Sequence, residues 1–513
     1  MAAPYITKVY LLDVPLENDY KNTLYFTSKA NQQSYFQSTI VKSYTDFSYQ
    51  RKDNLIRIPE IYDNLYNCNY VMYQNSNYSN KWFYAFITKM EYVNDGLTNV
   101  YIETDVMQTW AFDYNVKASF VEREHVSDDT LGIHTIPEGL ETGEYVVNSK
   151  SEESQNTDFT CVVGSTVSPG EVAAVYGGYY NGIPSGIRYY RYDNITGSDS
   201  NTLFSFLRLL EQHGKSDAIT GMFLCPKWLC GGSSSNIPIA TSNTVGSFTF
   251  QCNRITTLNG YTPRNNKLLT FPYCYTNLSN GQGSSAILHQ ELWTPGQNGM
   301  NSILVYGCLT PGCSIRAIPV NYKGVENNYD EGINLGKLPQ LNWTTDQYTN
   351  WLTQNGINIA VGIASSATQA GIGIASKNVK ETISGVSGIA SNLGEVYKHS
   401  LMPPQAEGNL NSGDVTTASG FNKFIAYNMT IRQEYARVID KYFDMFGYKV
   451  NMVKVPNTAH RSKWWYTKTI DVNIDGGIPD IDMQKIKDAY NKGITFWRNA
   501  SEIENYSLNN PIV

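Results

Sequence analysis

Charged residues are scarce in this chain of 513 residues: they make up 17% of it, with 39 Lys and Arg against 46 Asp and Glu. The missing basic excess argues against a dedicated nucleic-acid binder, because affinity for phosphates comes from positive charge. A coiled coil is disfavoured as well, because it needs far more Ala, Glu, Lys and Leu. Since 41% of the residues are hydrophobic, the chain can bury a core and is not intrinsically disordered.

Cysteine is also sparse, and no leader sequence stands out. Eight cysteines in 513 residues are too few for a disulfide scaffold, so we expect synthesis in a reducing cytoplasm with mostly free thiols. The first twenty residues contain Pro4 and one Lys before a short apolar run that Asp13 interrupts. We therefore expect neither a secretory signal nor a membrane span there.

Tyrosine and glycine are abundant instead, at 38 and 40 residues. A surface filled by Asn, Ser, Thr and Tyr is typical of β-rich extracellular or particle proteins. Residues 1–150 contain aromatic and β-branched runs that we interpret as hairpin strands: YVMYQN (70–75), KWFYAFITKMEYV (81–93) and NVYIETDVMQTW (99–110). The turn at 94–96 joins two of them. The predicted fold is mainly β (α+β), with a few packed helices.

The middle of the chain, 151–340, is predicted to be a second, loop-rich β domain. It contains short strands such as FTCVVGSTV (159–167) and SILVYGCLT (302–310), and one amphipathic helix. That helix carries Leu203, Phe206, Leu207 and Leu210 on one face, and Gly214 follows it as a C-cap.

The last part, 416–513, returns to ordinary globular patterning. We predict a helix over 430–446 with an apolar stripe and Gly447 at its end, followed by strands KVNMVKV (449–455) and KWWYTKTIDVNI (463–474). A second helix is predicted over 482–492, capped by Asp480 or Asp482 and closed by Gly493.

Between these parts lies a segment of a different kind, 341–415. After a short predicted helix near Thr344, Thr345 and Trp351, residues 347–376 contain no Asp, Glu, Lys or Arg. Apolar β-branched residues alternate there with small or polar ones. The residues we single out are Gly356, Ile357, Ile359, Val361, Gly362, Ile363, Gly371, Ile372, Gly373 and Ile374.

Several structures fit this segment. It is long enough for a transmembrane helix, but it is poor in Leu and Phe, so a permanent span is disfavoured. The alternation fits membrane β-strands, which need about 9–11 residues each and leave one barrel face polar. The small residues would also let helices approach closely. A flexible or internally packed loop stays open, although a solvated linker does not usually place Ile at every second residue.

Catalytic and metal motifs are weak. The six histidines belong to no HExxH or Cys/His signature, and no GxSxG is present. Glu122, Glu124 and His125 in VEREHV allow acid–base chemistry, but pairing between strands or subunits is the simpler interpretation. Cys225/Cys230 and Cys308/Cys313 are spaced loosely for zinc and fit buried thiols near turns.

A further pattern, 471–482, resembles a calcium loop in which Asp482 replaces the usual Glu. A strand precedes it instead of a helix, so a polar turn that caps the next helix is the alternative. We expect no catalytic residues, no cofactor and no bound metal, and we expect that the chain is not an enzyme.

Long motifs at both ends resemble the tail knob proteins of small podophages of the Picovirinae type. They are DVPLENDYKNTLYFTS (13–28), NSNYSNKWFYAFIT (75–88), IETDVMQTWAFD (102–113), FVEREHV (120–126), IHTIPEGLETGEY (133–145), FGYKVNMVKVPN (446–457) and YNKGITFWRN (490–499). The middle, about 151–340, matches poorly.

The resemblance implies a homo-hexamer that forms a hollow cylinder at the end of a short tail, together with other tail and collar proteins. It implies a tail-tube-like β-barrel or sandwich built from 1–150 and 416–513, and a distal β domain over 151–340. The segment 341–415 corresponds to a loop that plugs the lumen and then penetrates the host cell membrane as a pore. The protein is then expected at the tail tip of the virion, after synthesis in the host cytoplasm.

Viral DNA would pass through such a conduit without sequence-specific binding. A lumen rich in Lys and Arg would retain phosphates, whereas the net charge of −7 permits a wall along which the duplex slides. The many Tyr and Trp residues provide contact area of the kind that interfaces favour. The alternative function is a tail protein that binds the host surface or degrades the cell wall through its middle domain.

Overall fold

The computed structural model describes residues 7–45, 54–76, 79–155, 159–180, 183–193, 201–230, 239, 246–281, 283–296, 299–307, 309, 314–337, 340–341 and 423–513. The chain forms two compact units. Unit 1 consists of Met1–Thr142, Pro263–Leu268 and Glu434–Val513, and unit 2 of Gly143–Thr262 and Leu269–Gln433. The chain thus leaves one unit for the other after Thr142, Thr262, Leu268 and Gln433.

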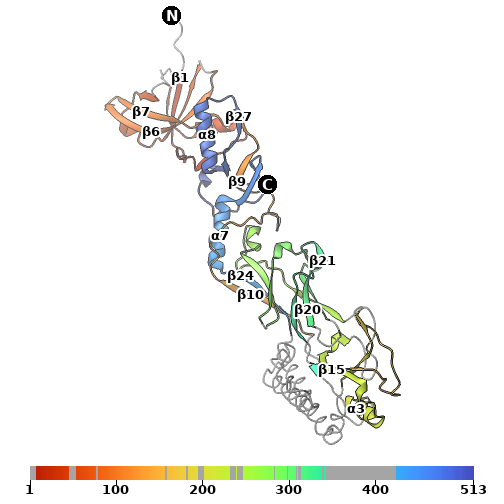
Figure 1. The fold of residues 1–513 in the computed structure, drawn as a ribbon. Coiled ribbons are helices and arrows are strands. Elements are labelled where there is room, and N and C mark those ends of the chain that lie inside the picture. The colour runs from red at the N-terminus through yellow and green to blue at the C-terminus, as the bar shows by residue number, and fades with distance from the viewer. Residues whose placement is uncertain are drawn as a thin grey trace, which may run out of the picture. The chain divides into compact units, whose positions relative to one another are not determined.

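Unit 1 contains a six-stranded antiparallel sheet with the strand order β3-β1-β5-β6-β7-β4. Its strands are β1 (Thr7–Leu12), β3 (Ile40–Tyr44), β4 (Leu55–Ile58), β5 (Tyr70–Asn75), β6 (Trp82–Asn94) and β7 (Leu97–Thr104). Val71 and Ala85 face each other across β5 and β6 and are fully buried, which shows that one face of this sheet packs into a core. Figure 1 shows β6 and β7 side by side in this sheet.

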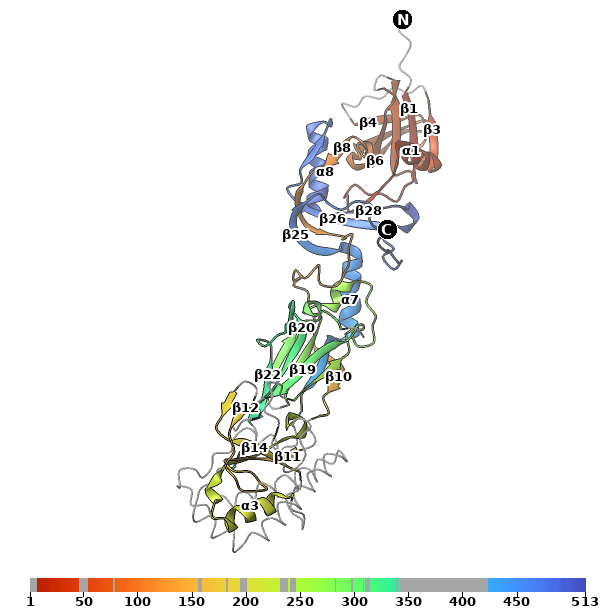
Figure 2. The ribbon, with the colours of Figure 1, turned by 90° about the vertical axis from the view of Figure 1, so that its right-hand side faces the viewer.

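A second sheet of unit 1 joins the beginning and the end of the chain, in the order β2-β28-β26-β9-β25. Its strands are β2 (Asn22–Leu24), β9 (Ser119–Glu124), β25 (Tyr448–Lys454), β26 (Trp464–Ile470) and β28 (Ile494–Trp497). β9 lies between two strands from the C-terminal part, and Figure 2 shows how β25, β26 and β28 lie together. A short pair, β8 (Tyr114–Val116) and β27 (Ile474–Gly476), completes the strands found among the described residues of this unit.

Helices cover these sheets. Phe36 of α1 (Lys29–Ser38) stacks on Tyr70 of β5 with a centroid distance of 5.4 Å. Figure 1 shows α8 (Asp480–Lys492) beside β27, and its Ile486 is fully buried in the same core as Trp465. The other α-helices described in this unit are α2 (Val106–Thr109) and α7 (Gln433–Phe446), whose first residue belongs to unit 2. The unit also contains the short 3₁₀ helices η2 (Tyr62–Asn64), η6 (Asn266–Leu269, whose last residue belongs to unit 2) and η9 (Ala500–Glu502).

Unit 2 is built from small antiparallel sheets. Their orders are β10-β24-β17-β18, β14-β11-β15-β23, β12-β13 and β16-β19-β20-β21, with β22 also pairing with β20. The strands are β10 (Tyr145–Glu152), β11 (Phe159–Ser165), β12 (Gly178–Tyr180), β13 (Ile183–Ser185), β14 (Arg188–Tyr192), β15 (Ile219–Pro226), β16 (Ser247–Cys252), β17 (Cys274–Ser279), β18 (Ser285–Leu288), β19 (Asn301–Gly307), β20 (Ser314–Tyr322), β21 (Val325–Asn327), β22 (Ile333–Lys337), β23 (Gln340–Leu341) and β24 (Ile425–Ile431).

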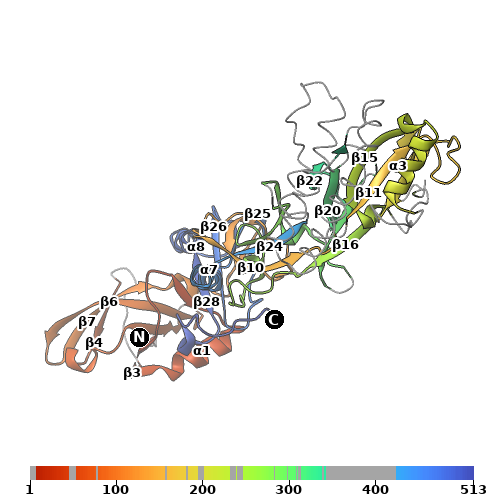
Figure 3. The ribbon, with the colours of Figure 1, turned by 90° about the horizontal axis from the view of Figure 1, so that it is seen from below.

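One helix, α3 (Leu203–Gln212), packs on β11, β14 and β15. Thr202 caps it: its hydroxyl accepts a hydrogen bond from the backbone N–H of Ser205, whose side chain bonds back to the cap. Leu203, Phe206 and Leu210 are buried against Val163 and neighbouring strand residues. Figure 3 shows α3 beside β11 and β15, and three 3₁₀ helices complete the described helices of this unit: η4 (Ser216–Ala218), η5 (Lys227–Cys230) and η7 (Gln290–Leu292).

The mainly β fold with a few packed helices is confirmed, as are the hairpin at 94–96 and the helix that Gly214 follows in a left-handed conformation with φ of 63°. The predicted strand over 99–110 is wrong beyond Thr104. There the buried carboxylate of Asp105 accepts hydrogen bonds from the backbone N–H groups of Met107 and Gln108 and so begins α2. Local capping therefore overrides the β-branched pattern.

Other boundaries also differ from the prediction. The strand expected over 463–474 ends at Ile470, because Asp471 has a positive φ of 53° and turns the chain toward β27. The helix expected from 430 begins at Gln433, because β24 extends to Ile431. The expected cap of α8 by Asp480 or Asp482 is wrong: the N-cap residue is Pro479, without a side-chain hydrogen bond.

Candidate functional site: anchors of the uncharged segment and a polar clasp

The residues of the predicted membrane-active loop lie outside the described part of the chain. This applies to Gly356, Ile357, Ile359, Val361, Gly362, Ile363, Gly371, Ile372, Gly373 and Ile374, and to the short helix expected near Thr344. The structure describes the residues on either side of the stretch 342–422, which contains most of the segment, and both of these points belong to unit 2. We call these points the anchors of the segment.

The first anchor is β23. This strand pairs with β15 in antiparallel register, with Leu341 opposite Met222 and Gln340 opposite Phe223. Phe223 is buried in the larger hydrophobic core of unit 2. The chain therefore enters the segment from a strand that is hydrogen-bonded to a packed sheet.

The second anchor is the start of β24. Phe424 is fully buried in the core that also contains Phe223, and its carbonyl oxygen accepts a hydrogen bond of 3.2 Å from the N–H of Glu153. Lys423 forms an ion pair with Glu152, and hydrogen bonds from Lys150 and Lys423 lower the pKa of Glu152 to about 2. Both ends of the segment are thus fixed on one core.

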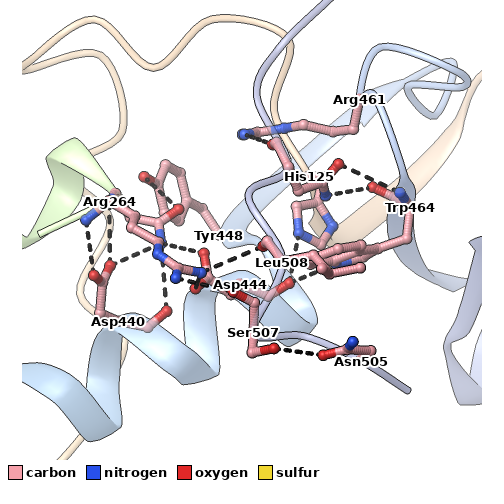
Figure 4. A network of polar contacts seen from close by, with 12 residues as sticks. His125, Arg264, Asp440, Asp444, Tyr448, Arg461, Trp464, Asn505, Ser507 and Leu508 are labelled. Carbon is pink, nitrogen blue, oxygen red and sulfur yellow. Dashed lines mark hydrogen bonds and ion pairs between the residues drawn. The ribbon is translucent and has the colours of Figure 1, made fainter. Parts of the chain in front are cut away.

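A second constellation lies in unit 1, where the short return segment Pro263–Leu268 meets α7. Figure 4 shows its centre. The carboxylate of Asp440, which is fully buried, accepts hydrogen bonds from the backbone N–H of Arg264 at 2.8 Å and of Asn265 at 3.1 Å. It also accepts one from the side-chain amide of Asn265 at 2.8 Å. We call this set of contacts the clasp.

Neighbouring groups extend the clasp. Asp444 accepts hydrogen bonds from Asn265 at 2.9 Å and from the guanidinium of Arg264 at 3.3 Å. The same guanidinium donates to the carbonyl oxygens of Ser507 and Leu508, as drawn in Figure 4. Burial raises the pKa of Asp444, and the hydrogen bond from Asn265 opposes that rise.

A buried acid holds the other side of the return segment. The carboxylate of Glu138 pairs with Arg123 and with Lys267, and it accepts a hydrogen bond of 2.9 Å from the N–H of Lys449. The side chain of Glu138 is not exposed, and those of Arg123 and Lys267 are 9% and 2% exposed. Burial lowers the pKa of Lys267, and the charge of Glu138 opposes that effect. Removing one partner of such a buried ion cluster strongly destabilises a protein, because the remaining charge stays buried without compensation.

His125 forms a hydrogen bond with a backbone carbonyl group in the last turn of α7. Its Nδ1 accepts a hydrogen bond of 2.8 Å from the N–H of Tyr466, so the proton lies on Nε2, which donates to the carbonyl oxygen of Asp444 at 3.1 Å. Trp464 donates to the same carbonyl at 2.8 Å, so the two rings satisfy an acceptor that has no partner within the helix. Burial, together with the positive charge of Arg461, lowers the pKa of His125 to about 3.

The charged residues of the VEREHV motif pair with neighbouring strands of the same chain. Glu124 is fully buried, pairs with Lys454 and accepts a hydrogen bond of 2.7 Å from the N–H of Asn457. Glu122 pairs with Lys468 at 2.9 Å on the neighbouring strand. The acid–base interpretation finds no support in an arrangement whose charges are neutralised within the sheet.

The residues of the calcium-like and cysteine patterns make other contacts in the structure or lie outside its described part. Asp482 accepts a hydrogen bond of 2.9 Å from the indole of Trp110, and Asp475 faces Lys117 at 3.5 Å in the β8–β27 pair. Cys225 and Cys230 are buried free thiols, while Cys308 and Cys313 lie outside the described residues. Within the described ranges, no three His, Cys, Asp or Glu side chains form a group that could hold a metal ion. In that same part of the chain, no helix has the length and apolar character needed to cross a membrane.

The clasp was missed from the sequence, although one signal was present. Asp440 and Asp444 are one helical turn apart and adjoin the apolar stripe that contains Ile439 and Phe443. A carboxylate at the edge of a buried stripe needs hydrogen-bond donors from elsewhere. The donors come from Arg264 and Asn265, which no local pattern relates to the helix.

Comparisons with known proteins identify the family. The model of the C-terminal domain of tail knob protein gp9 of Bacillus phage phi29 matches residues 240–511, just over half of the chain. The chain belongs to this tail knob protein family. A second model, the N-terminus of the caudoviral major tail protein, matches residues 6–115.

Full-length relatives agree with the tail knob family. The chain is 26% identical to tail knob protein gp9 of Bacillus phage PZA, over 98% of each chain. It is also 26% identical to tail knob protein gp9 of Bacillus phage B103, over 98% of this chain and 97% of the relative. The solved structure of the bacteriophage C1 tail knob protein, gp12, matches with a TM-score of 0.64 at 16% identity and covers 99% of this chain and 100% of that one. At this identity the structural match shows the shared fold alone.

Membership of the tail knob family establishes the general role of the chain. The chain is a tail knob protein, a structural component of a short phage tail in the virion, and it assembles with other tail proteins. The tail knob family is structural and not enzymatic, which argues against the wall-degrading alternative.

Proposed function

We propose that six copies of this tail knob protein form a hollow tube at the end of the tail through which the viral DNA leaves. In this proposal 1–150 and 416–513 form the tube wall, and 151–340 forms a distal domain. The segment 341–415 plugs the lumen before infection. After a trigger it enters the host cell membrane and lines a pore.

The observation that carries the proposal is an uncharged, alternating segment held between two anchored strands. Residues 347–376 contain no charged side chain, and β-branched residues alternate from Ile357 to Ile363. An ordinary solvated loop of this length would be expected to carry charge and little Ile. The anchors fix both ends to the packed core that contains Phe223 and Phe424.

Several copies are needed for this mechanism. Membrane β-strands span with about 9–11 residues each, but a lone strand pair leaves its edges without hydrogen-bond partners in lipid. Strands from six copies together could close a barrel whose inner face stays polar. Stowage in a lumen would keep the apolar face away from water until then.

The test uses the purified full chain and a variant that lacks 356–400. Mass measurement of the assembled particle should give a hexamer for both chains, because the anchors and units remain. Only the full chain should release dye from liposomes, after acidification or another trigger. A matched control replaces 356–376 by a Ser/Gly/Asn sequence of equal length and should behave like the deletion.

Two outcomes would contradict the proposal separately. A strict monomer at micromolar concentration would argue against the ring. Equal dye release from the full chain and from both altered chains would argue against the role of the segment, whatever the oligomeric state.

A further inference from the structure

Unit 2 contains a pair of buried thiols that the proposed function does not use. The Sγ atoms of Cys225, in β15, and Cys230, in η5, are 3.3 Å apart. Cys225 is fully buried and Cys230 is 2% exposed. Both lie in the core that also holds Phe424.

A third cysteine lies nearby but on the other side of the sheet. Cys161 of β11 is the register partner of Leu224, and side chains alternate between the faces of a strand. Cys161 therefore packs into the core with α3, whereas Cys225 packs into the opposite core. Cys230 lies in the same core as Cys225 and is the thiol in contact with it, at 3.3 Å.

We propose that Cys225 and Cys230 are a modification site that oxidises to an intramolecular disulfide when the chain meets a small-molecule disulfide. A disulfide bond is about 2.05 Å long, so the two sulfur atoms have to approach by roughly 1.2 Å. A movement of this size is within the reach of side-chain rotation, and residues 227–230 form a short 3₁₀ turn that already brings the thiols together.

The reaction balances with two small thiols as products. The thiolate of one cysteine attacks the oxidant, forms a mixed disulfide and releases the first small thiolate, which takes up the proton. The second cysteine then attacks the protein sulfur of that mixed disulfide and expels the second small thiol. Two electrons pass from the cysteine pair to the oxidant, and both protein protons end on the released thiols.

Burial sets the rate of this step. Desolvation raises the pKa of Cys225 well above its ordinary value, so the attacking thiolate is rare at neutral pH. Oxidation should therefore be slow during assembly in a reducing cytoplasm and should become possible in the virion outside the cell.

The bond would stabilise one anchor of the uncharged segment. Phe223, two residues before Cys225 on β15, pairs with Gln340 of β23. Linking Cys225 to the following turn would restrict the end of this strand. The inference is independent of the proposed pore, because the thiol pair and its strand exist whether or not the segment enters a membrane.

The experiment treats the full chain, purified in reductant, with oxidised glutathione at pH 8.5. After denaturation and alkylation, mass spectrometry should show two fewer alkyl groups than in the reduced chain and a disulfide cross-link between the peptides that contain Cys225 and Cys230. The oxidised chain should melt about 4 °C higher than the reduced chain. Adding a dithiol reductant should reverse both changes.

Matched variants separate this pair from other thiols. C225S and C230S should each abolish the cross-link and the melting shift, whereas C252S, which removes another buried thiol of unit 2, should keep both. A cross-link elsewhere in place of this one, a glutathione adduct as the final product, or alkylation of both Cys225 and Cys230 in the oxidised wild type would overturn the proposal. Melting curves of the reduced variants check that each one folds.

Discussion

Removing the carboxylate of Asp440 should release the return segment Pro263–Leu268 from α7. The carboxylate accepts hydrogen bonds from two backbone N–H groups and one side-chain amide, and it is fully buried. A buried donor left without its partner costs about 1–3 kcal/mol. For the amides of Arg264 and Asn265 together, D440A should remove about 3 kcal/mol of local protection.

Hydrogen exchange measured by mass spectrometry can detect this loss directly. Since about 1.4 kcal/mol corresponds to a tenfold change in an equilibrium constant, the two amides should exchange about 100-fold faster in D440A. D440N, which keeps the shape but replaces one acceptor oxygen by a donor, should show a comparable increase. E434Q, an exposed change on the same helix, is the matched control and should leave these amides unaffected. Unchanged exchange at Arg264 and Asn265 in D440A would refute the clasp.

Two further predictions concern the end of α7. The pKa of His125, about 3, lies below the ordinary value of 6.5, so the unfolded chain binds the extra proton and stability falls as the pH drops from about 6.5 toward 3. The free energy of unfolding, measured by urea titration between pH 7 and 4, should therefore fall less steeply in H125Q than in wild type, by up to about 1.4 kcal/mol per pH unit. The exposed change His213→Gln is the control, and equal slopes in H125Q and wild type would contradict the assignment. Gly447→Ala should destabilise unit 1 by about 3 kcal/mol or more, because the new Cβ would lie 2.1 Å from the carbonyl oxygen of Glu124. Gly214 has the same φ of 63° with nothing within 4 Å, so G214A isolates the conformational cost of about 1–2 kcal/mol, and equal losses in the two variants would exclude the clash.

The sequence predicted those elements that a strong local pattern specifies. The apolar stripe with Ile439 and Phe443 indicated α7, and the turn at 94–96 indicated the β6–β7 hairpin; both are present. α1 was not predicted, because only Gln32 and Phe36 of its ten residues are buried, and so weak a stripe is hard to read from sequence.

The features that could not be predicted from the sequence depend on pairing between distant parts of the chain. β9 lies between β25 and β26, which follow more than 300 residues later, and the residues between them carry no sign of that arrangement. The donors to Asp440 also come from far away in the chain, 175 and 176 residues before it, so the clasp depends on topology and not on a motif. The resemblance to the tail knob family, by contrast, rests on long motifs rich in Trp, Tyr and Asn, and the family model confirms it.

The central claim is that the uncharged segment moves from a stowed position into lipid. It is tested most directly by attaching an environment-sensitive dye at single introduced cysteines, I359C and N358C, in a C308S/C313S background. Quenchers are then placed in the lipid acyl chains. Before the trigger we expect no quenching by lipid at either position. After dye release begins, position 359 should be quenched strongly and position 358 weakly, because neighbouring side chains of a membrane strand face lipid and lumen in turn. Release without lipid quenching at either position would contradict the account.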